Sequence, residues 1–253
     1  LSYHYFSRLL RTDDARVRAT RAFEDLLRDA GVDLVTIEVR DPPAEATPDR
    51  SGAAPRLYGA GYRETVRLRD GSEVLLKTLR PEDKGLLAAG FEHLSKESRF
   101  RRFFAFKSRL TEGELRYFTE IDGEAHFALG AGRRGEDGAL EGLGTARFVR
   151  KTDEPGTAEL AVAVVDEWQG LGLGRALLNR LIEAAEERGI ERLVGTVMGE
   201  NDVMIHLLGT AARARLRWRD GFVEVELELK PGPAGSRVGS SHLEDGAVPS
   251  SSE

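Results

Sequence analysis

Length, composition and charge already limit what this chain can be. Its 253 residues are 40% hydrophobic, which is enough for a packed core, and 43 acidic side chains outnumber 37 basic ones. The net charge of −6 argues against a nucleic-acid partner, and the absence of cysteine excludes disulfides and thiolate metal sites. No apolar run reaches the roughly 18 residues of a membrane span, and the first residues lack a signal-peptide pattern. We therefore expect a cytoplasmic protein with no membrane partner.

Composition separates both ends of the chain from the middle. Residues 1–40 combine a helical apolar pattern from Val17 to Ala30 with an alternating stretch, which predicts a small α-β extension. Residues 41–61 are rich in proline and alanine with few apolar anchors, which is typical of a linker. Residues 230–253 are glycine, proline and serine with scattered charge, and we expect a disordered tail there.

The main predicted domain, residues 62–229, opens with two short strands on either side of Asp70-Gly71, a hairpin signal. Three helix starts follow. Pro81 suits a first helical turn, Ser95 can cap a second helix, and Thr111 begins a Thr-x-x-Glu capping box for a third.

The rest of the domain alternates between strands and helices. Asn201 is placed to cap a helix that we expect to run to about Ala212, and Asp220-Gly221 predicts a closing hairpin. The predicted order is β-β-α-α-α-β-β-β-α-β-α-β-β, which indicates an α/β protein with a mixed sheet and helices on both faces. The later strands are expected over residues 127–132, 143–149, 160–165, 193–198, 215–219 and 222–229.

The chain is organised around the glycine-rich turn between an apolar strand and a helix that Gly189 is placed to end. The turn reads Gln-Gly-Leu-Gly-Leu-Gly-Arg over 169–175. Glycines let backbone N–H groups approach a ligand, and a helix N-terminus favours anions, so the turn predicts a phosphate site. It is not a dinucleotide fingerprint, because Arg175 stands where the third glycine would be needed, and it lacks the Gly-Lys-Ser/Thr of a P-loop.

This turn resembles the acetyl-CoA signature of the GNAT N-acetyltransferase superfamily, R/Q-x-x-G-x-G/A. Further stretches are similar to the GNAT domain of bacterial Pat-like protein lysine acetyltransferases: LRPEDK at 79–84, LSKESRFRRFF at 94–104, FTEID at 118–122 and AELAV at 158–162. The resemblance covers roughly residues 62–229. It implies a GNAT-type acyl-CoA N-acyltransferase fold and acetyl-CoA as co-substrate. We expect no metal, because the turn with Asp122, Glu124 and His126 offers a single histidine.

The resemblance also implies which residues hold acetyl-CoA. In the family two central parallel strands splay apart, the pantetheine adds beside one of them, and a backbone N–H faces the thioester oxygen. The matching cofactor-binding positions are Val162, Ala163, Val164, Gln169, Gly170, Leu171, Gly172, Leu173, Gly174, Arg175 and Asn201. For Asn201, a plain helix cap is an equally good interpretation.

Glu159 is the catalytic candidate. An attacking lysine amine arrives protonated and must lose a proton before or during attack. Glu159 is a lone carboxylate at the head of an apolar strand, on the face of the small residues Ala161 and Ala163, and Pat-like enzymes carry a catalytic glutamate at the matching position. A solvated glutamate at a strand start is the alternative. We interpret His206 as structural and His126 as structural or at the substrate rim.

Three functions stay open. The first is acetylation of a protein lysine, for example on an acyl-CoA synthetase, and the second is acetylation of a small amine, which several carboxylates around the acceptor pocket would favour. The third is a non-catalytic acetyl-CoA-binding regulatory module. It stays open because the helix after Asn201 has no Tyr to act as general acid and the spacing over 209–221 departs from the family. We expect a monomer or a homodimer that pairs at a sheet edge.

Overall fold

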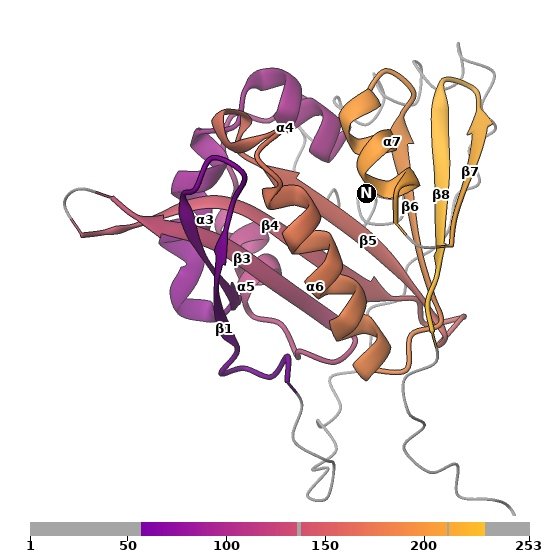
Figure 1. Ribbon diagram of the computed structural model, residues 1–253, viewed down its shortest axis with the longest axis horizontal. Coiled ribbons are helices and arrows are strands. Elements are labelled where there is room, and N and C mark those ends of the chain that lie inside the picture. Colours follow the sequence, from indigo (N-terminus) through magenta and orange to yellow (C-terminus); the bar gives the residue numbers. More distant parts are fainter. Residues whose placement is uncertain (1–56, 136–137, 212, 231–253) are drawn as a thin grey trace, which may run out of the picture.

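The computed structural model describes residues 57–230, apart from 136–137 and 212. They form one eight-stranded mixed sheet with helices on both faces (Figure 1), and the elements follow the predicted order. The extension expected over 1–40, residues 41–56 of the expected linker and residues 231–253 of the tail expected over 230–253 lie outside the described residues. Within the described part, no helix is both long enough and apolar enough to cross a bilayer.

The sheet has the strand order β1-β2-β3-β4-β5-β6-β8-β7. All neighbours are antiparallel except β5 and β6, which are parallel. Strand β5 begins three residues before its predicted start, because Thr157 to Glu159 pair with β6 and two of them, Ala158 and Glu159, also pair with β4. The strands are β1 (Arg63–Arg67), β2 (Glu73–Thr78), β3 (His126–Arg134), β4 (Leu140–Arg150), β5 (Thr157–Val164), β6 (Arg192–Met198), β7 (Ala214–Arg219) and β8 (Phe222–Glu228).

The helices divide between the two faces of the sheet. In Figure 1, α6 lies in front of β3 to β5, while α3 and α5 lie behind them. The helices are α3 (Lys84–Glu92), α4 (Lys96–Phe103), α5 (Glu112–Thr119), α6 (Leu173–Glu187) and α7 (Asp202–Gly209), with short 3-10 turns η1 (Pro81–Asp83) and η2 (Asp166–Trp168).

Residues that were predicted to cap helices form the expected capping hydrogen bonds. Ser95 Oγ accepts a hydrogen bond from the Ser98 N–H at 3.0 Å, and Thr111 and Glu114 form the reciprocal capping box. Gly189, at φ +68°, ends α6 in the left-handed conformation that glycine favours. Helix α7 is the exception, since it ends at Gly209, three residues before the predicted end.

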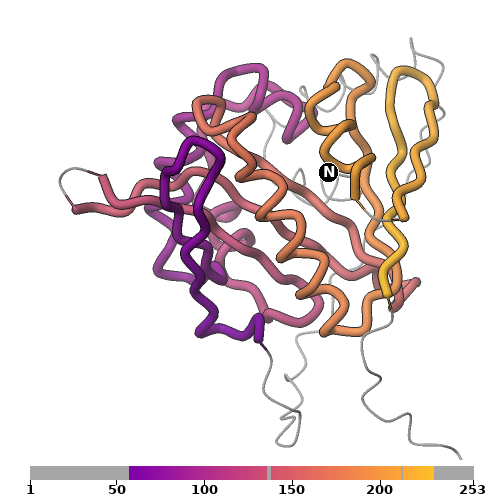
Figure 2. The backbone as a smooth tube through the Cα atoms, viewed as in Figure 1, coloured from indigo at the N-terminus to yellow at the C-terminus, as the bar shows by residue number. Residues whose placement is uncertain are grey.

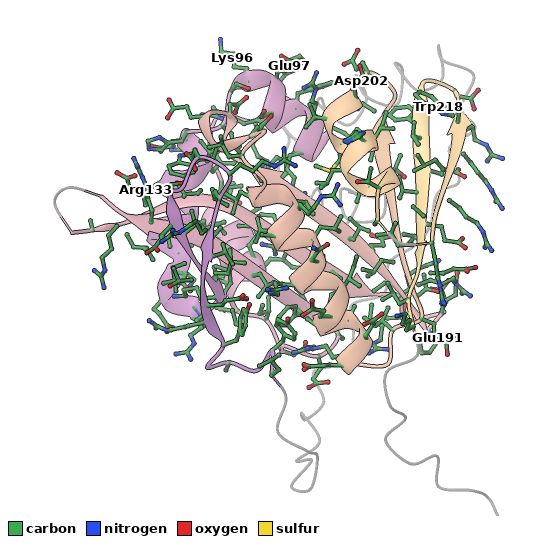
Figure 3. All side chains as sticks on the ribbon, viewed as in Figure 1. Lys96, Glu97, Arg133, Glu191, Asp202 and Trp218 are labelled. Atoms are coloured by element: carbon green, nitrogen blue, oxygen red, sulfur yellow. The ribbon has the colours of Figure 1, made fainter. Side chains whose placement is uncertain are left out.

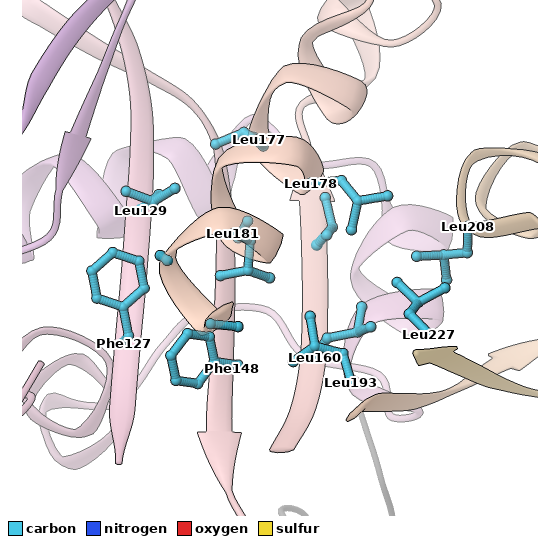
Figure 4. Close-up of a cluster of buried hydrophobic side chains, with 14 of the residues drawn as sticks. Phe127, Leu129, Phe148, Leu160, Leu177, Leu178, Leu181, Leu193, Leu208 and Leu227 are labelled. Carbon is cyan, nitrogen blue, oxygen red and sulfur yellow. The ribbon is translucent and has the colours of Figure 1, made fainter. Parts of the chain in front are cut away.

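The main core lies between α6 and the sheet (Figure 4). Helix α6 buries one apolar stripe, since residues four apart return to the same helical face. Each fully buried leucine or phenylalanine stabilises the fold by roughly 1.5–3 kcal/mol. Fully buried side chains here include Leu177, Leu178 and Leu181 from α6 and Phe127, Phe148, Leu193 and Leu227 from the sheet. A second cluster, Phe91, Leu94, Phe103, Phe118 and Val165, lies under α3 to α5.

Tyr58 packs with the domain, although it falls inside the stretch predicted as linker. Its side chain is 2% exposed, its hydroxyl donates to Glu183, and its carbonyl accepts from Arg188 Nη2 at 2.9 Å. Burial, followed by the bond to Glu183, raises the pKa of Tyr58. A single aromatic anchor after a run of prolines and alanines gives no periodic pattern, so the composition of 41–61 did not reveal it.

Candidate active site

The site begins where the two parallel strands separate. The ladder between β5 and β6 has three pairs, ending at Glu159 opposite Val194, and both strands then continue apart (Figure 2). A cleft of about 250 Å³ opens between Leu160–Val164 and Gly195–Val197. Beyond Glu159, the β6-facing edge of β5 therefore has no strand partner in the described structure, and its backbone groups are available to a ligand.

The predicted glycine turn forms one end of this cleft. Gly170 has φ +74° and Gly172 has φ +98°, and Gly172 is the N-cap of α6. The turn thus presents the first backbone N–H groups of a 15-residue helix to the cleft, which is the arrangement that binds phosphate. Gln169 lines the cleft, and its Nε2 donates to the Val164 carbonyl at 3.0 Å, which ties the turn to the end of β5.

The other predicted coenzyme residues fall into two groups. Val162, Ala163, Val164, Gly174, Arg175 and Asn201 line the cleft. Asn201 also caps α7 by accepting from the Met204 N–H at 3.2 Å, so the two interpretations of this residue are compatible. Leu171 and Leu173 differ, because neither side chain lines the cleft: Leu173 is fully buried and Leu171 packs against the same core. The Leu171 carbonyl accepts from the Arg69 N–H at 3.1 Å instead.

Helix α4 forms a wall that the sequence reasoning missed. Ser98, Arg101 and Arg102 line the cleft from a single face of this helix, and Leu94, in the bend before it, lines the cleft as well. The helix is held by Asp166, whose carboxylate accepts from the Ser95 N–H at 2.9 Å, Ser95 Oγ at 2.8 Å and Ser98 Oγ at 2.8 Å. Partial burial acts to raise the pKa of Asp166, but these bonds outweigh it, and the pKa lies below its ordinary value.

The lining of the cleft is strongly cationic. It includes Arg69, Arg101, Arg102 and Arg175 and no Asp or Glu among the described residues, although the whole chain carries a net charge of −6. A low-dielectric cleft lined by one sign of charge concentrates ligands of the opposite sign. The cleft is therefore built for an anionic ligand.

Glu159 faces a second hollow on the sheet surface. This groove of about 230 Å³ is lined by Glu159, Glu224, Glu226, Arg215 and Arg217, among others. It shares Gly195 and Thr196 with the cleft, so the two hollows meet at the point where the strands separate. Glu159 is partly exposed rather than fully buried.

The two histidines differ in their surroundings. His126 packs against the Tyr117 ring with 4.8 Å between centroids, and its Nε2 lies 3.1 Å from Arg147 Nη1. His206 is exposed on the cleft wall rather than packed against its apolar neighbours, so the structural interpretation of this residue was wrong. Among the described residues no three side chains are grouped as metal ligands.

Comparison with known proteins identifies the family. The model of the Acetyltransferase (GNAT) family matches residues 91–209. Acetyltransferase PA5475 of Pseudomonas aeruginosa is 31% identical over 155 residues, covering 61% of this chain and 81% of that protein. The chain belongs to the GNAT acetyltransferase family. Acetyltransferase Pat of Mycolicibacterium smegmatis is 30% identical over 167 residues, covering 66% of this chain and 49% of Pat, so the chain spans about half of that relative.

Solved structures agree with this assignment to the GNAT family. The crystal structure of the GNAT domain of S. lividans PAT superposes with a TM-score of 0.61 at 31% identity, covering 68% of this chain and 99% of that domain. The structure of yncA from Salmonella typhimurium with its cofactor acetyl-CoA shares the fold at 20% identity and a TM-score of 0.51, covering 65% and 98%. The predicted mixed α/β GNAT fold is thereby confirmed for the described residues.

Proposed function

We propose that this GNAT enzyme transfers the acetyl group of acetyl-CoA to the ε-amine of a protein lysine. One observation carries the proposal: Glu159 lies in a groove that meets the cationic cleft at Gly195 and Thr196. Donor and acceptor then approach the point of strand separation from different hollows. The Pat relatives and the S. lividans PAT domain support a Pat-like role.

In this proposal the cleft holds the coenzyme. The glycine turn and its arginines would bind the phosphates, and the unpartnered edge of β5 at Val162 to Val164 would lie along the pantetheine. A backbone N–H of that edge would stabilise the negative charge that develops on the thioester oxygen. Acetyl-CoA supplies the activated acyl group, and the strands supply its orientation.

Glu159 would take the proton of the acceptor. The amine nitrogen forms a bond to the thioester carbon, the carbon–sulfur bond breaks, and the nitrogen loses a proton to the Glu159 carboxylate. The thiolate that leaves takes a proton from water. The chain has no cysteine that could carry the acetyl group, so direct transfer to the amine is expected.

The test is transfer of radiolabelled acetyl groups from acetyl-CoA to proteins of a bacterial extract by the purified protein. Wild type should label a few discrete proteins on lysine, and Glu159→Gln should bind acetyl-CoA normally while losing on the order of 100-fold or more in kcat. Glu141→Gln is the matched control, because Glu141 is an exposed carboxylate that pairs with Arg133 (labelled in Figure 3), at the opposite end of β4 from the residue that pairs with Glu159. Equal rates for wild type and Glu159→Gln at neutral pH would remove Glu159 from this role.

A small cationic amine is the second candidate acceptor, and the groove itself favours it. Three carboxylates, Glu159, Glu224 and Glu226, line the groove, although Arg215 forms an ion pair with Glu226 at 3.2 Å. The L-amino acid N-acyltransferase MnaT of Escherichia coli is 34% identical to this chain over 89 residues, which cover 30% of this chain and 52% of that protein. Turnover of free amines or amino acids with no label on protein would favour this candidate.

A further inference from the structure

The tip of the β1–β2 hairpin lies beside the glycine turn (Figure 2). The Arg69 N–H donates to the Leu171 carbonyl at 3.1 Å, so the backbones of hairpin and turn are joined. The side chain of Arg69 continues in the same direction. A Cβ built on Gly172 would lie 3.8 Å from Arg69 Cγ and 3.9 Å from Arg69 Nε. The arginine side chain therefore lies next to Gly172, the N-cap of α6.

Nothing in the described structure neutralises Arg69. Its side chain is exposed and forms no ion pair with a described carboxylate. The adjacent acid, Asp70, is turned toward Ser72, whose N–H and Oγ donate to Asp70 Oδ1 at 3.0 and 2.7 Å. The Arg69 side chain thus lies beside the turn with its charge available to a ligand.

A second arginine stands on the other side of the turn. Arg175, in the first turn of α6, lines the same cleft and donates to the Thr210 hydroxyl at the end of α7. One arginine therefore comes from the hairpin and the other is bonded to the end of α7, and these two elements lie on either side of α6 (Figure 1). Two oppositely placed guanidiniums match a pyrophosphate, which offers oxygens on both sides.

We propose that Arg69 is a coenzyme-binding residue that contacts the pyrophosphate of acetyl-CoA from the side opposite Arg175. The inference rests on the proposed function and adds to it a residue from outside the segment that the family model matches, 91–209. Because the contact is made by an exposed charge, it weakens as ionic strength rises.

The test measures the dissociation constants of coenzyme A and of dephospho-coenzyme A, which lacks only the 3′-phosphate. Arg69→Ala should weaken both by the same factor, about tenfold, and Arg69→Lys by less, because lysine keeps the charge but not the two-pronged donor. Acetyl-pantetheine, which has no phosphate, should be turned over by Arg69→Ala as by wild type, which a merely misfolded hairpin would not allow. Arg67→Ala is the control, since Arg67 is on the same hairpin and pairs with Glu73 instead.

Each other outcome is decisive. Unchanged affinity of Arg69→Ala for coenzyme A, beside normal binding by wild type, overturns this assignment alone. A loss seen with coenzyme A but absent with dephospho-coenzyme A would place Arg69 at the 3′-phosphate instead and also overturns it. Wild type that binds neither compound would overturn the proposed function together with this inference.

Discussion

The backbone conformation of the glycine turn depends on Gly172. Its φ of +98° turns the chain from the end of the loop into α6, and residues with a Cβ adopt such a conformation only with strain. Space is not the constraint, because the nearest atoms to a built Cβ belong to Arg69 at 3.8 Å and beyond. The strain is in the backbone itself.

We expect Gly172→Ala to destabilise the fold by roughly 1–2 kcal/mol and to weaken acetyl-CoA binding, because relief of the strain moves the N–H groups that face the cleft. Gly85→Ala is the matched control with the opposite sign. Gly85 lies in α3 with nothing within 4 Å of a built Cβ, so alanine there should stabilise by up to about 1 kcal/mol. Chemical denaturation and calorimetric binding measure both, and an equal effect of the two substitutions would contradict the argument.

At the scale of elements, a polar clamp joins the start of α4 to the turn after β5. Asp166, in the turn after β5, accepts bonds from Ser95 and Ser98 at the start of the helix. The same helix carries Arg101 and Arg102, which line the cleft. Helix, strand and glycine turn are therefore coupled through one carboxylate.

The clamp predicts an acid-sensitive contribution to stability. Because the folded pKa of Asp166 is lowered, its contribution is fully present above the ordinary pKa near 3.9 and is lost as the pH falls through the lowered value. Asp166→Ala should reduce the free energy of unfolding by about 1 kcal/mol at pH 7, and the difference from wild type should shrink below about pH 4. The neighbouring Glu167→Ala should show neither effect, and a difference that stays constant down to pH 2.5 would exclude the clamp.

For the molecule as a whole, the folded domain reaches back to Tyr58. This residue joins the chain before β1 to the C-terminal half of α6, through Glu183, Glu187 and Arg188. The first strand is thus held at both ends, by Tyr58 before it and by the contact of Arg69 with the glycine turn after it.

Tyr58→Ala should cost roughly 3 kcal/mol, because it removes a fully buried aromatic ring, and should lower Tm by roughly 6–12 °C. Tyr58→Phe keeps the ring and loses only the hydroxyl bond, so its cost should be smaller. Leu57→Ala serves as the control, since Leu57 is 67% exposed and should change stability by less than about 0.5 kcal/mol. Thermal unfolding followed by circular dichroism distinguishes the three.

Secondary structure and helix caps could be predicted from the sequence, whereas contacts between residues far apart in the chain could not. The order of strands and helices, the caps at Ser95 and Thr111 and the end of α6 at Gly189 all follow from short-range patterns, and the structure confirms them. Arg69 lies about a hundred residues from the glycine turn, and no spacing rule connects a hairpin tip to a helix start. The groove around Glu159 was missed for the same reason, because Glu224 and Glu226 come from β8.

The cleft's charges have a consequence for control of the reaction. Among the described residues the lining holds four arginines and no carboxylate, and the proposed ligand's phosphates would be held there. Free coenzyme A, the product, keeps every one of those phosphates and loses only the acetyl group. Product and donor would therefore compete for the cleft with similar affinities. The rate of acetylation would then depend on the ratio of acetyl-CoA to free coenzyme A, and so on the acetylated fraction of the cell's coenzyme A.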